Sequence, residues 1–424
     1  MDEILIFLYI TAWFIVTISY WKKRKSLDIG FFLLLFYSIL SIFSYYAFKS
    51  ELDTRLKDFS FFPFVFLLAI ELFILSPLLL YNEKSIEKSV PPNPHLIDLI
   101  AWICIIPNIL SIPDAINSLS EGLTRLAFDV ASGGEMYLEN RDIVESTGHG
   151  IHNITSIMCN GFSGITVLLI FYYATLNRKS RLIFSLLLIS SVAQAFGSIA
   201  QGTRGGLVEY ALLMVFTYLL LKNFMPSSIK RWVRIAGISF MALATMAIAA
   251  LTIGRFGDGD SGAGQATAYY AGQQNLYFNK YAFDNNGIRY GDRTIPLFKR
   301  MIGIPNVPHN YAERRNKYPA LKINDEAFIG YVGDFMLDFG PIIGTLLLII
   351  QISFVRRNTK VKKKKIYFHQ IILLHFTLYM VTIGAIKLYP FADVSGNLQV
   401  MVYTSLFIVF YIDYYKKQML GKIA

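Results

Sequence analysis

Long apolar runs alternate with short basic or polar connections along the whole chain. Runs of about 18 or more apolar residues are typical of transmembrane helices, because a helix of that length crosses the hydrocarbon core and satisfies its own backbone groups. The pattern therefore predicts about 11 transmembrane helices. We expect them at residues 4–21, 29–48, 59–81, 96–112, 151–176, 182–200, 207–221, 235–253, 328–354, 366–386 and 398–415.

Basic clusters follow alternate apolar runs, most strongly at Lys22–Lys25 and Lys362–Lys365. Such clusters stay in the cytoplasm, so the N-terminus is expected outside and the C-terminus inside. The expected fold class is an all-α integral membrane protein in which residues 1–424 form one polytopic domain. Two longer connections fall on the outer side, at residues 113–150 and 254–327, and the second is expected to cover the active site.

Composition agrees with a membrane location and excludes several other classes of protein. The apolar fraction is 54% and the mean hydropathy is +0.46. The net charge of +11 sits in short clusters beside apolar runs, which indicates membrane topology rather than a nucleic-acid partner. Both cysteines lie within apolar runs, and the chain has no nucleotide-binding or zinc-protease motif. We therefore expect no metal and no cofactor.

Two arginines mark the outer ends of predicted helices. Arg204 stands between Thr203 and Gly205 at the start of a helix, and Arg255 ends another. An arginine this close to lipid needs an anionic partner or water, and its planar guanidinium group suits phosphate oxygens. The alternative for each is an interfacial arginine that reaches lipid headgroups.

The long outer segment brings together residues suited to acid–base chemistry. His309 lies in the proline-containing stretch Val307–Tyr311, where it suits a general base or a diphosphate donor, or is a plain surface residue. Asp334 and Asp338 are four residues apart on one helix face. Because like charges at that spacing repel, they favour nearby arginines or a proton-accepting role; the alternative is that they complement the helix dipole.

Aromatic and amide side chains gather earlier in the same segment, at Tyr269, Tyr270, Tyr277 and their neighbours. They form an amphipathic stretch that we expect to lie along the membrane interface. These side chains suit sugar rings, and they suit an interfacial aromatic belt equally. Arg125, in the earlier outer connection, is either a second anion contact or a solvated residue.

Three motifs carry a resemblance to a known family: Gly202-Thr203-Arg204-Gly205, Pro308-His309-Asn310, and the stretch GDFMLDFG at residues 333–340. With the number and orientation of the helices, they make the chain similar to the Wzy-type O-antigen and capsule repeat-unit polymerases, relatives of the O-antigen ligases. The resemblance extends over nearly the whole chain.

The resemblance implies a GT-C-like glycosyltransferase of the bacterial cytoplasmic (inner) membrane. It would transfer the growing glycan, with inversion and without metal, from undecaprenyl diphosphate onto a new lipid-linked unit at the outer face. A chain-length regulator in the membrane is an implied partner, besides membrane lipids. An O-antigen ligase and a flippase or transporter of lipid-linked oligosaccharide remain alternatives.

The implied site divides into three sets of residues. The catalytic set is His309, Arg204 and Asp334, with His309 preferred over Asp334 as the base. The diphosphate-binding set is Arg204, Arg255, Arg289, Arg293 and Arg125. The glycan-binding set is Tyr269, Tyr270, Tyr277, Asn310 and Asp338.

Overall fold

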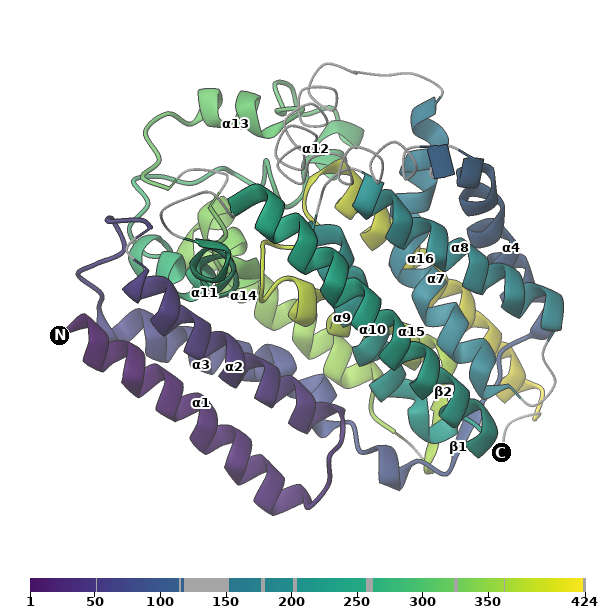
Figure 1. Cartoon of the computed structure of the whole chain (residues 1–424). Coiled ribbons are helices and arrows are strands. Elements are labelled where there is room, and N and C mark those ends of the chain that lie inside the picture. Colours follow the sequence, from purple (N-terminus) through teal and green to yellow (C-terminus); the bar gives the residue numbers. More distant parts are fainter. Residues whose placement is uncertain are drawn as a thin grey trace. The chain divides into compact units, whose positions relative to one another are not determined.

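The computed structural model describes residues 1–50, 52–113, 116–117, 152–176, 180–200, 204–256, 262–323, 327–361 and 363–421. In this part the chain is largely helical, with one pair of short strands (Figure 1). The helices are α1 (Asp2–Arg24), α2 (Ile29–Lys49), α3 (Phe61–Leu80), α4 (Pro94–Leu110), α7 (His152–Thr175), α8 (Arg181–Ala200), α9 (Arg204–Leu221), α10 (Ser227–Phe256), α11 (Gly262–Tyr281), α12 (Pro296–Met301), α13 (Tyr311–Lys317), α14 (Gly330–Asn358), α15 (Phe368–Ile383) and α16 (Asp393–Met419).

Each apolar run predicted from the sequence falls on a helix, from α1 for the first run to α16 for the last. Among the described residues, seven helices are long and apolar enough to cross a membrane, and α4, α15 and part of α8 are shorter apolar helices. The all-α character is therefore confirmed. The segment predicted as an outer connection is itself partly helical, since it contains α11, α12 and α13.

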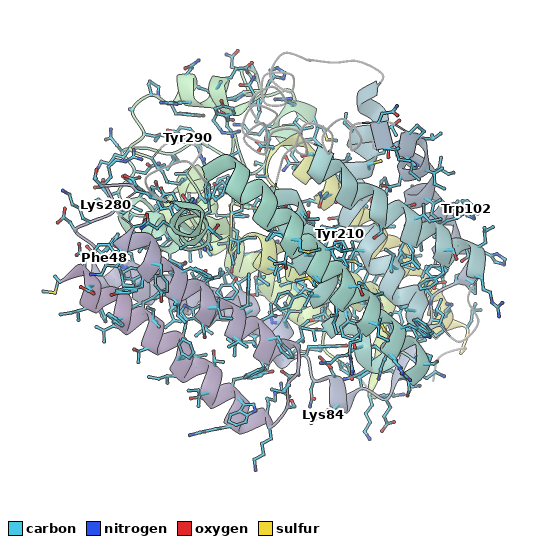
Figure 2. All side chains as sticks on the ribbon, in the orientation of Figure 1. Phe48, Lys84, Trp102, Tyr210, Lys280 and Tyr290 are labelled. Carbon is cyan, nitrogen blue, oxygen red and sulfur yellow. The ribbon has the colours of Figure 1, made fainter. Side chains whose placement is uncertain are left out.

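Large apolar side chains cover the outer faces of several long helices. On α14, Ile342 is 78% exposed and Ile350 is 64% exposed. The side chains drawn in Figure 2 include Trp102 of α4, which is also exposed. Exposed apolar surface of this extent is unusual in water-soluble proteins. It is the surface that lipid would cover.

The described chain divides into two compact units, each built from segments distant in sequence. The first consists of Met1–Glu83, Gly264–Val361 and Phe376–Val400. In this unit α1 packs on α2 and α3, and α14 packs on α3. A side-chain hydrogen bond joins α1 to α2, since the hydroxyl groups of Thr17 and Ser38 lie 2.9 Å apart.

The second unit consists of Lys84–Ala263, Lys362–His375 and Met401–Ala424. In it α7 packs on α4, α8 and α9, and α9 packs on α10. The strands β1 (Lys88–Val90) and β2 (Lys365–Tyr367) form a parallel pair in which Lys88 is opposite Lys365. His375 is fully buried between Thr217 and Tyr403, at 2.9 Å and 2.8 Å. Both of its ring nitrogens thus form hydrogen bonds within this unit.

Helix α14 is interrupted at Gly340, whose φ of 79° lies in the region that favours glycine, and Pro341 follows. Residues 330–338, before the break, are buried on every side of the helix. After the break, the helix carries the exposed apolar face described above. The first part of α14 is therefore an interior helix, and it carries Asp334 and Asp338 into the first unit.

Candidate functional site

Arg289 lies between the two aspartates of α14. Its Nε donates to Asp338 Oδ1 at 2.6 Å, and its Nη2 donates to Asp334 Oδ1 at 3.0 Å. The arginine side chain is 2% exposed and both carboxylates are fully buried. The spacing of the aspartates on one helix face is thus confirmed. Of the alternatives for the pair, the structure shows arginines alongside.

The remaining oxygen atoms of the two carboxylates are also bonded. Asp338 Oδ2 accepts from the backbone and hydroxyl of Thr294 at 2.7 Å and 2.8 Å, and Asp334 Oδ2 accepts from the Tyr389 backbone at 2.8 Å. Arg293 adds an ion pair to Asp334 at 3.5 Å. Buried charges are stable only when paired and hydrogen-bonded in this way. The cluster therefore fixes the connection around Arg289 against α14.

Asp292 organises the two short helices that follow. Its buried carboxylate pairs with Lys299 of α12 and, at 2.6 Å, with Lys317 of α13, and it accepts from the Tyr318 hydroxyl at 2.7 Å. Burial alone would raise the pKa of Asp292, but the hydrogen bonds from these two lysines outweigh it and lower the pKa. Asp292 therefore holds α12 and α13 together.

The start of α13 is capped by Asn310, whose side-chain oxygen accepts from the Glu313 backbone at 2.8 Å. Glu313 in turn accepts from the His309 backbone at 2.7 Å. These two bonds are related to a capping box, except that Glu313 accepts from the residue before the cap, and they fix the direction in which the chain enters the helix. They orient the exposed His309 just before α13.

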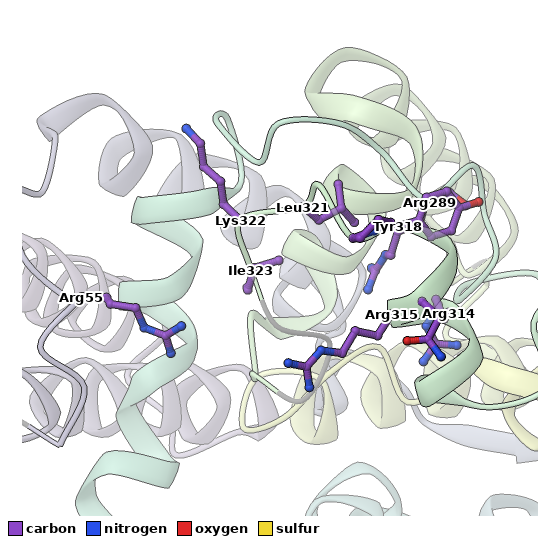
Figure 3. A pocket seen from close by; sticks show the side chains of 10 residues that line it. Arg55, Arg289, Arg314, Arg315, Tyr318, Leu321, Lys322 and Ile323 are labelled. Carbon is purple, nitrogen blue, oxygen red and sulfur yellow. The ribbon is translucent and has the colours of Figure 1, made fainter.

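A cavity of about 440 Å³ opens on one side of α13, and we call it the arginine pocket. It is lined by Arg55, Arg289, Arg314, Arg315, Asn316, Tyr318, Pro319, Leu321, Lys322 and Ile323. Five of these residues are cationic and none is acidic. Figure 3 shows Arg55 and Arg315 pointing toward each other from opposite sides of the pocket.

The cations of the arginine pocket differ in how far they are neutralised. Arg289 is paired as described, Arg314 binds Asp393 at 2.9 Å, and Lys322 pairs with Asp284. Arg315 is exposed and has no ion-pair partner among the residues that the structure describes. A lone guanidinium among further cations attracts an anion with several oxygen atoms, such as a phosphate or diphosphate.

A second cavity, of about 640 Å³, contains His309, and we call it the histidine cavity. It is lined by Arg300, Gly303, Ile304, Asn306, Val307, Pro308, His309, Glu313 and Lys317. Helix α13 contributes to both spaces, with Arg314 and Arg315 in the arginine pocket and Glu313 and Lys317 in this one. An ionisable histidine is thus close in sequence to an anion-attracting pocket.

Arg55 was not expected in any site. It lies in the short connection between α2 and α3, and Asp53 binds it through Nε at 2.8 Å and Nη2 at 2.7 Å. The hydrogen bonds from Arg55 are the largest cause that lowers the pKa of Asp53 to about 2. The sequence signal was weak, an Asp-x-Arg triplet in a short polar connection.

The residues predicted from the sequence are only partly brought together. Asp334, Asp338, Arg289 and Arg293 form one buried cluster, and His309 lies in the histidine cavity. Arg204 begins α9, as expected for a residue that opens a helix, and Arg255 lies near the end of α10, but neither side chain is among those described. Arg125 lies outside the described residues. Their predicted roles stay predictions.

The aromatic and amide stretch forms α11, but this helix does not lie along a surface as expected. Tyr277 is 3% exposed and Asn275 is 7% exposed. Gly272 allows this close packing, because a Cβ atom there would lie 2.2 Å from the Phe43 carbonyl. The polar atoms are satisfied internally, as when Asn275 donates to the Ser44 hydroxyl at 2.9 Å. Of the three predicted glycan-binding tyrosines, Tyr270 is the most exposed, at 36%.

In the described part of the chain, no three histidine, cysteine, aspartate or glutamate side chains are grouped so that they could hold a metal ion. Both cysteines are free thiols. Comparisons with family models, curated proteins and solved structures give no match for this chain.

Proposed function

We propose that the protein is a polytopic membrane glycosyltransferase that polymerises lipid-linked oligosaccharide repeat units. The proposal places it in the bacterial cytoplasmic membrane with α12 and α13 on the outer face. The growing glycan would move from undecaprenyl diphosphate to a new lipid-linked unit. The motifs at Arg204, His309 and Asp334 and the succession of apolar helices support this assignment.

The observation that carries the proposal is that the arginine pocket and the histidine cavity are both formed in part by α13. Glycosyl transfer from a lipid diphosphate needs positive charge at the leaving group and a base at the acceptor hydroxyl. The first need is met by Arg315 and Arg55, and the second by His309. Apolar helices in the same protein let the polyprenyl tails of both substrates stay in lipid.

In the proposed reaction, a hydroxyl group of the new unit attacks C1 of the donor sugar. The bond between C1 and the diphosphate oxygen breaks, and the lipid diphosphate leaves with the bonding electrons. The hydroxyl proton passes to the His309 imidazole. Attack on the face opposite the leaving group inverts the configuration at C1.

This assignment shifts the diphosphate contacts from those predicted by the sequence. Arg315 and Arg55 take the place of Arg289 and Arg293, because the latter two are buried against the aspartates of α14. Arg55 is also paired, with Asp53, but its side chain is 58% exposed and so remains accessible to a ligand. Arg204, Arg255 and Arg125 remain proposed as further contacts. Asp334 becomes a residue that holds the site rather than the base, because both of its oxygens already accept hydrogen bonds.

The test of this function is the size distribution of lipid-linked glycan in cells that lack the protein. We expect single repeat units on the carrier, and a ladder of longer chains once the wild-type protein is restored. Long chains stranded on the carrier would instead indicate a ligase. Unchanged glycan on the outer surface would contradict glycosyl transfer, and repeat units confined to the inner leaflet would indicate a flippase.

A further inference from the structure

A chain of hydrogen bonds leads from α11 to Arg55 in the arginine pocket. The Tyr269 and Tyr277 hydroxyl groups lie 2.7 Å apart, and Tyr277 donates to Asp53 Oδ2 at 2.5 Å. Asp53 then binds Arg55 through two side-chain nitrogens and, at 3.0 Å, through its backbone. The Asp53 side chain is 8% exposed, whereas that of Arg55 is 58% exposed. The carboxylate is thus fixed inside while the guanidinium reaches outward.

Helix α11 also holds the backbone around this pair. Asn279 accepts from the Ser60 backbone at 3.0 Å and donates to the Ser60 carbonyl at 2.8 Å. Lys280 donates to the Lys57 carbonyl at 2.9 Å. These contacts hold the second half of the connection between α2 and α3, and the bond from Tyr277 to Asp53 holds the first half. The connection is therefore held at several points along its length.

The held guanidinium keeps donors for a ligand. An arginine has five N–H donors, and the bonds to Asp53 occupy only those of Nε and Nη2 on one side of the fork. Nη1 of Arg55 has no partner among the described residues. In Figure 3 the guanidinium points across the pocket toward Arg315. A diphosphate has several oxygen atoms, so it is a kind of ligand that suits both arginines.

We propose that Asp53 and Tyr277 are positioning residues that hold the Arg55 guanidinium for binding phosphate oxygens in the arginine pocket. The inference rests on the proposed function, which assigns a diphosphate to that pocket. Without Asp53, Arg55 would be a flexible side chain that loses its rotamer freedom when it binds. With Asp53, this freedom is already lost before the ligand arrives.

Charge and positioning predict opposite effects for one substitution. Asp53 is negative and lies next to an anion-attracting pocket, so charge alone predicts that Asp53→Asn strengthens anion binding. Positioning predicts that the same change weakens binding, because Arg55 is no longer held. The sign of the effect therefore separates the two explanations.

The experiment measures the affinity of the purified full-length chain for inorganic pyrophosphate by calorimetry. We expect Arg55→Ala to weaken binding by about tenfold or more, the worth of a charged hydrogen bond. Asp53→Asn and Tyr277→Phe should each weaken it less. In the Arg55→Ala background neither should have a further effect, because they act only through Arg55. A general structural defect would instead add to the loss from Arg55→Ala.

Tighter binding in Asp53→Asn, or an equal loss with and without Arg55, would overturn the positioning role. If Asp53→Asn does not fold, Tyr277→Phe tests the same role through the neighbouring bond. Arg315→Ala separates this inference from the proposed site. Pyrophosphate binding that depends on Arg315 but not on Asp53 would overturn the inference alone, and wild-type protein that does not bind pyrophosphate would overturn the pocket assignment with it.

Discussion

At the scale of single residues, partners decide which polar groups are available for chemistry. Arg289 and Arg315 line the same pocket, but Arg289 is bonded to two buried carboxylates, whereas Arg315 has no ion-pair partner in the described part of the chain. The sequence predicted Arg289 as a diphosphate-binding residue, because it could not show that two buried carboxylates already bind this arginine. A substrate anion would meet Arg315 as an uncompensated charge.

His309→Ala should slow glycan polymerisation by about 100- to 10,000-fold, the usual contribution of a general base. The histidine is exposed in its cavity, and its position depends on its backbone bond to Glu313, so truncating the side chain leaves that bond in place. The rate of ladder formation in complemented cells measures this effect. His95→Ala, a change at an exposed histidine in α4, is the matched control. Equal loss in both variants would contradict the role of His309.

Asp53 makes stability sensitive to acid. Its pKa in the folded protein is about 2, below the ordinary value of 3.8, chiefly because of the hydrogen bonds from Arg55. A lowered pKa stabilises the fold above the unfolded value, so this contribution is complete above about pH 4 and is lost as the pH falls toward about 2. The melting temperature in detergent should fall less between pH 5 and pH 3 for Asp53→Asn than for wild type. An identical fall would contradict the ion pair.

At the scale of elements, periodicity predicted the long helices well because each apolar run is long and uninterrupted. It failed where neighbours decide the outcome. The polar composition of α11 indicated a surface helix. Instead, the close packing at Gly272 and the hydrogen bonds donated by the side-chain amides of Asn275 and Asn279 place it inside. The break at Gly340 was also not expected, although Gly340-Pro341 is a plausible signal for it in hindsight.

The candidate site was predictable only in part, for a related reason. The four-residue spacing of Asp334 and Asp338 predicted a shared face, because helix geometry alone determines it. Nearby arginines were one of the alternatives left open for the pair, and the structure shows them. Arg55 was missed because its contribution depends on contacts with α11, such as the bond between Asp53 and Tyr277, which are 224 positions apart in the sequence. No local pattern carries information of that kind.

Asp338→Ala should lower the free energy of unfolding by about 3–5 kcal/mol, because it leaves the buried Arg289 charge short of a partner. Asp338 also accepts hydrogen bonds from the backbone and hydroxyl of Thr294, and these buried donors lose their acceptor as well. Denaturant titration of the purified protein measures the free energy of unfolding. Asp284→Ala removes the exposed pair with Lys322 in the same segment and should cost less than about 1 kcal/mol. Equal losses of unfolding free energy in the two variants would contradict a stabilising role for the buried cluster.

At the scale of the whole molecule, the proposal requires α13 on the outer side and the basic end of α14 on the inner side. Single cysteines at Ala320 and Arg357, both exposed, test this in a chain whose Cys104 and Cys159 are replaced by serine. A membrane-impermeant maleimide should label intact cells at position 320 and reach position 357 only after permeabilisation. The reverse pattern would contradict the orientation that the basic clusters predict.

The most direct measurement uses the single repeat units that accumulate in cells lacking the protein as substrate for the purified chain in lipid. Wild type should convert them into a ladder of multiples and release lipid diphosphate. Arg315→Ala should do so at least about 100-fold more slowly, by analogy with losing one charge-stabilising donor. Arg231→Ala, at an exposed arginine of α10, should match wild type. Equal rates for Arg315→Ala and wild type would contradict the arginine pocket as the site of transfer, and no ladder with wild type would contradict the polymerase itself.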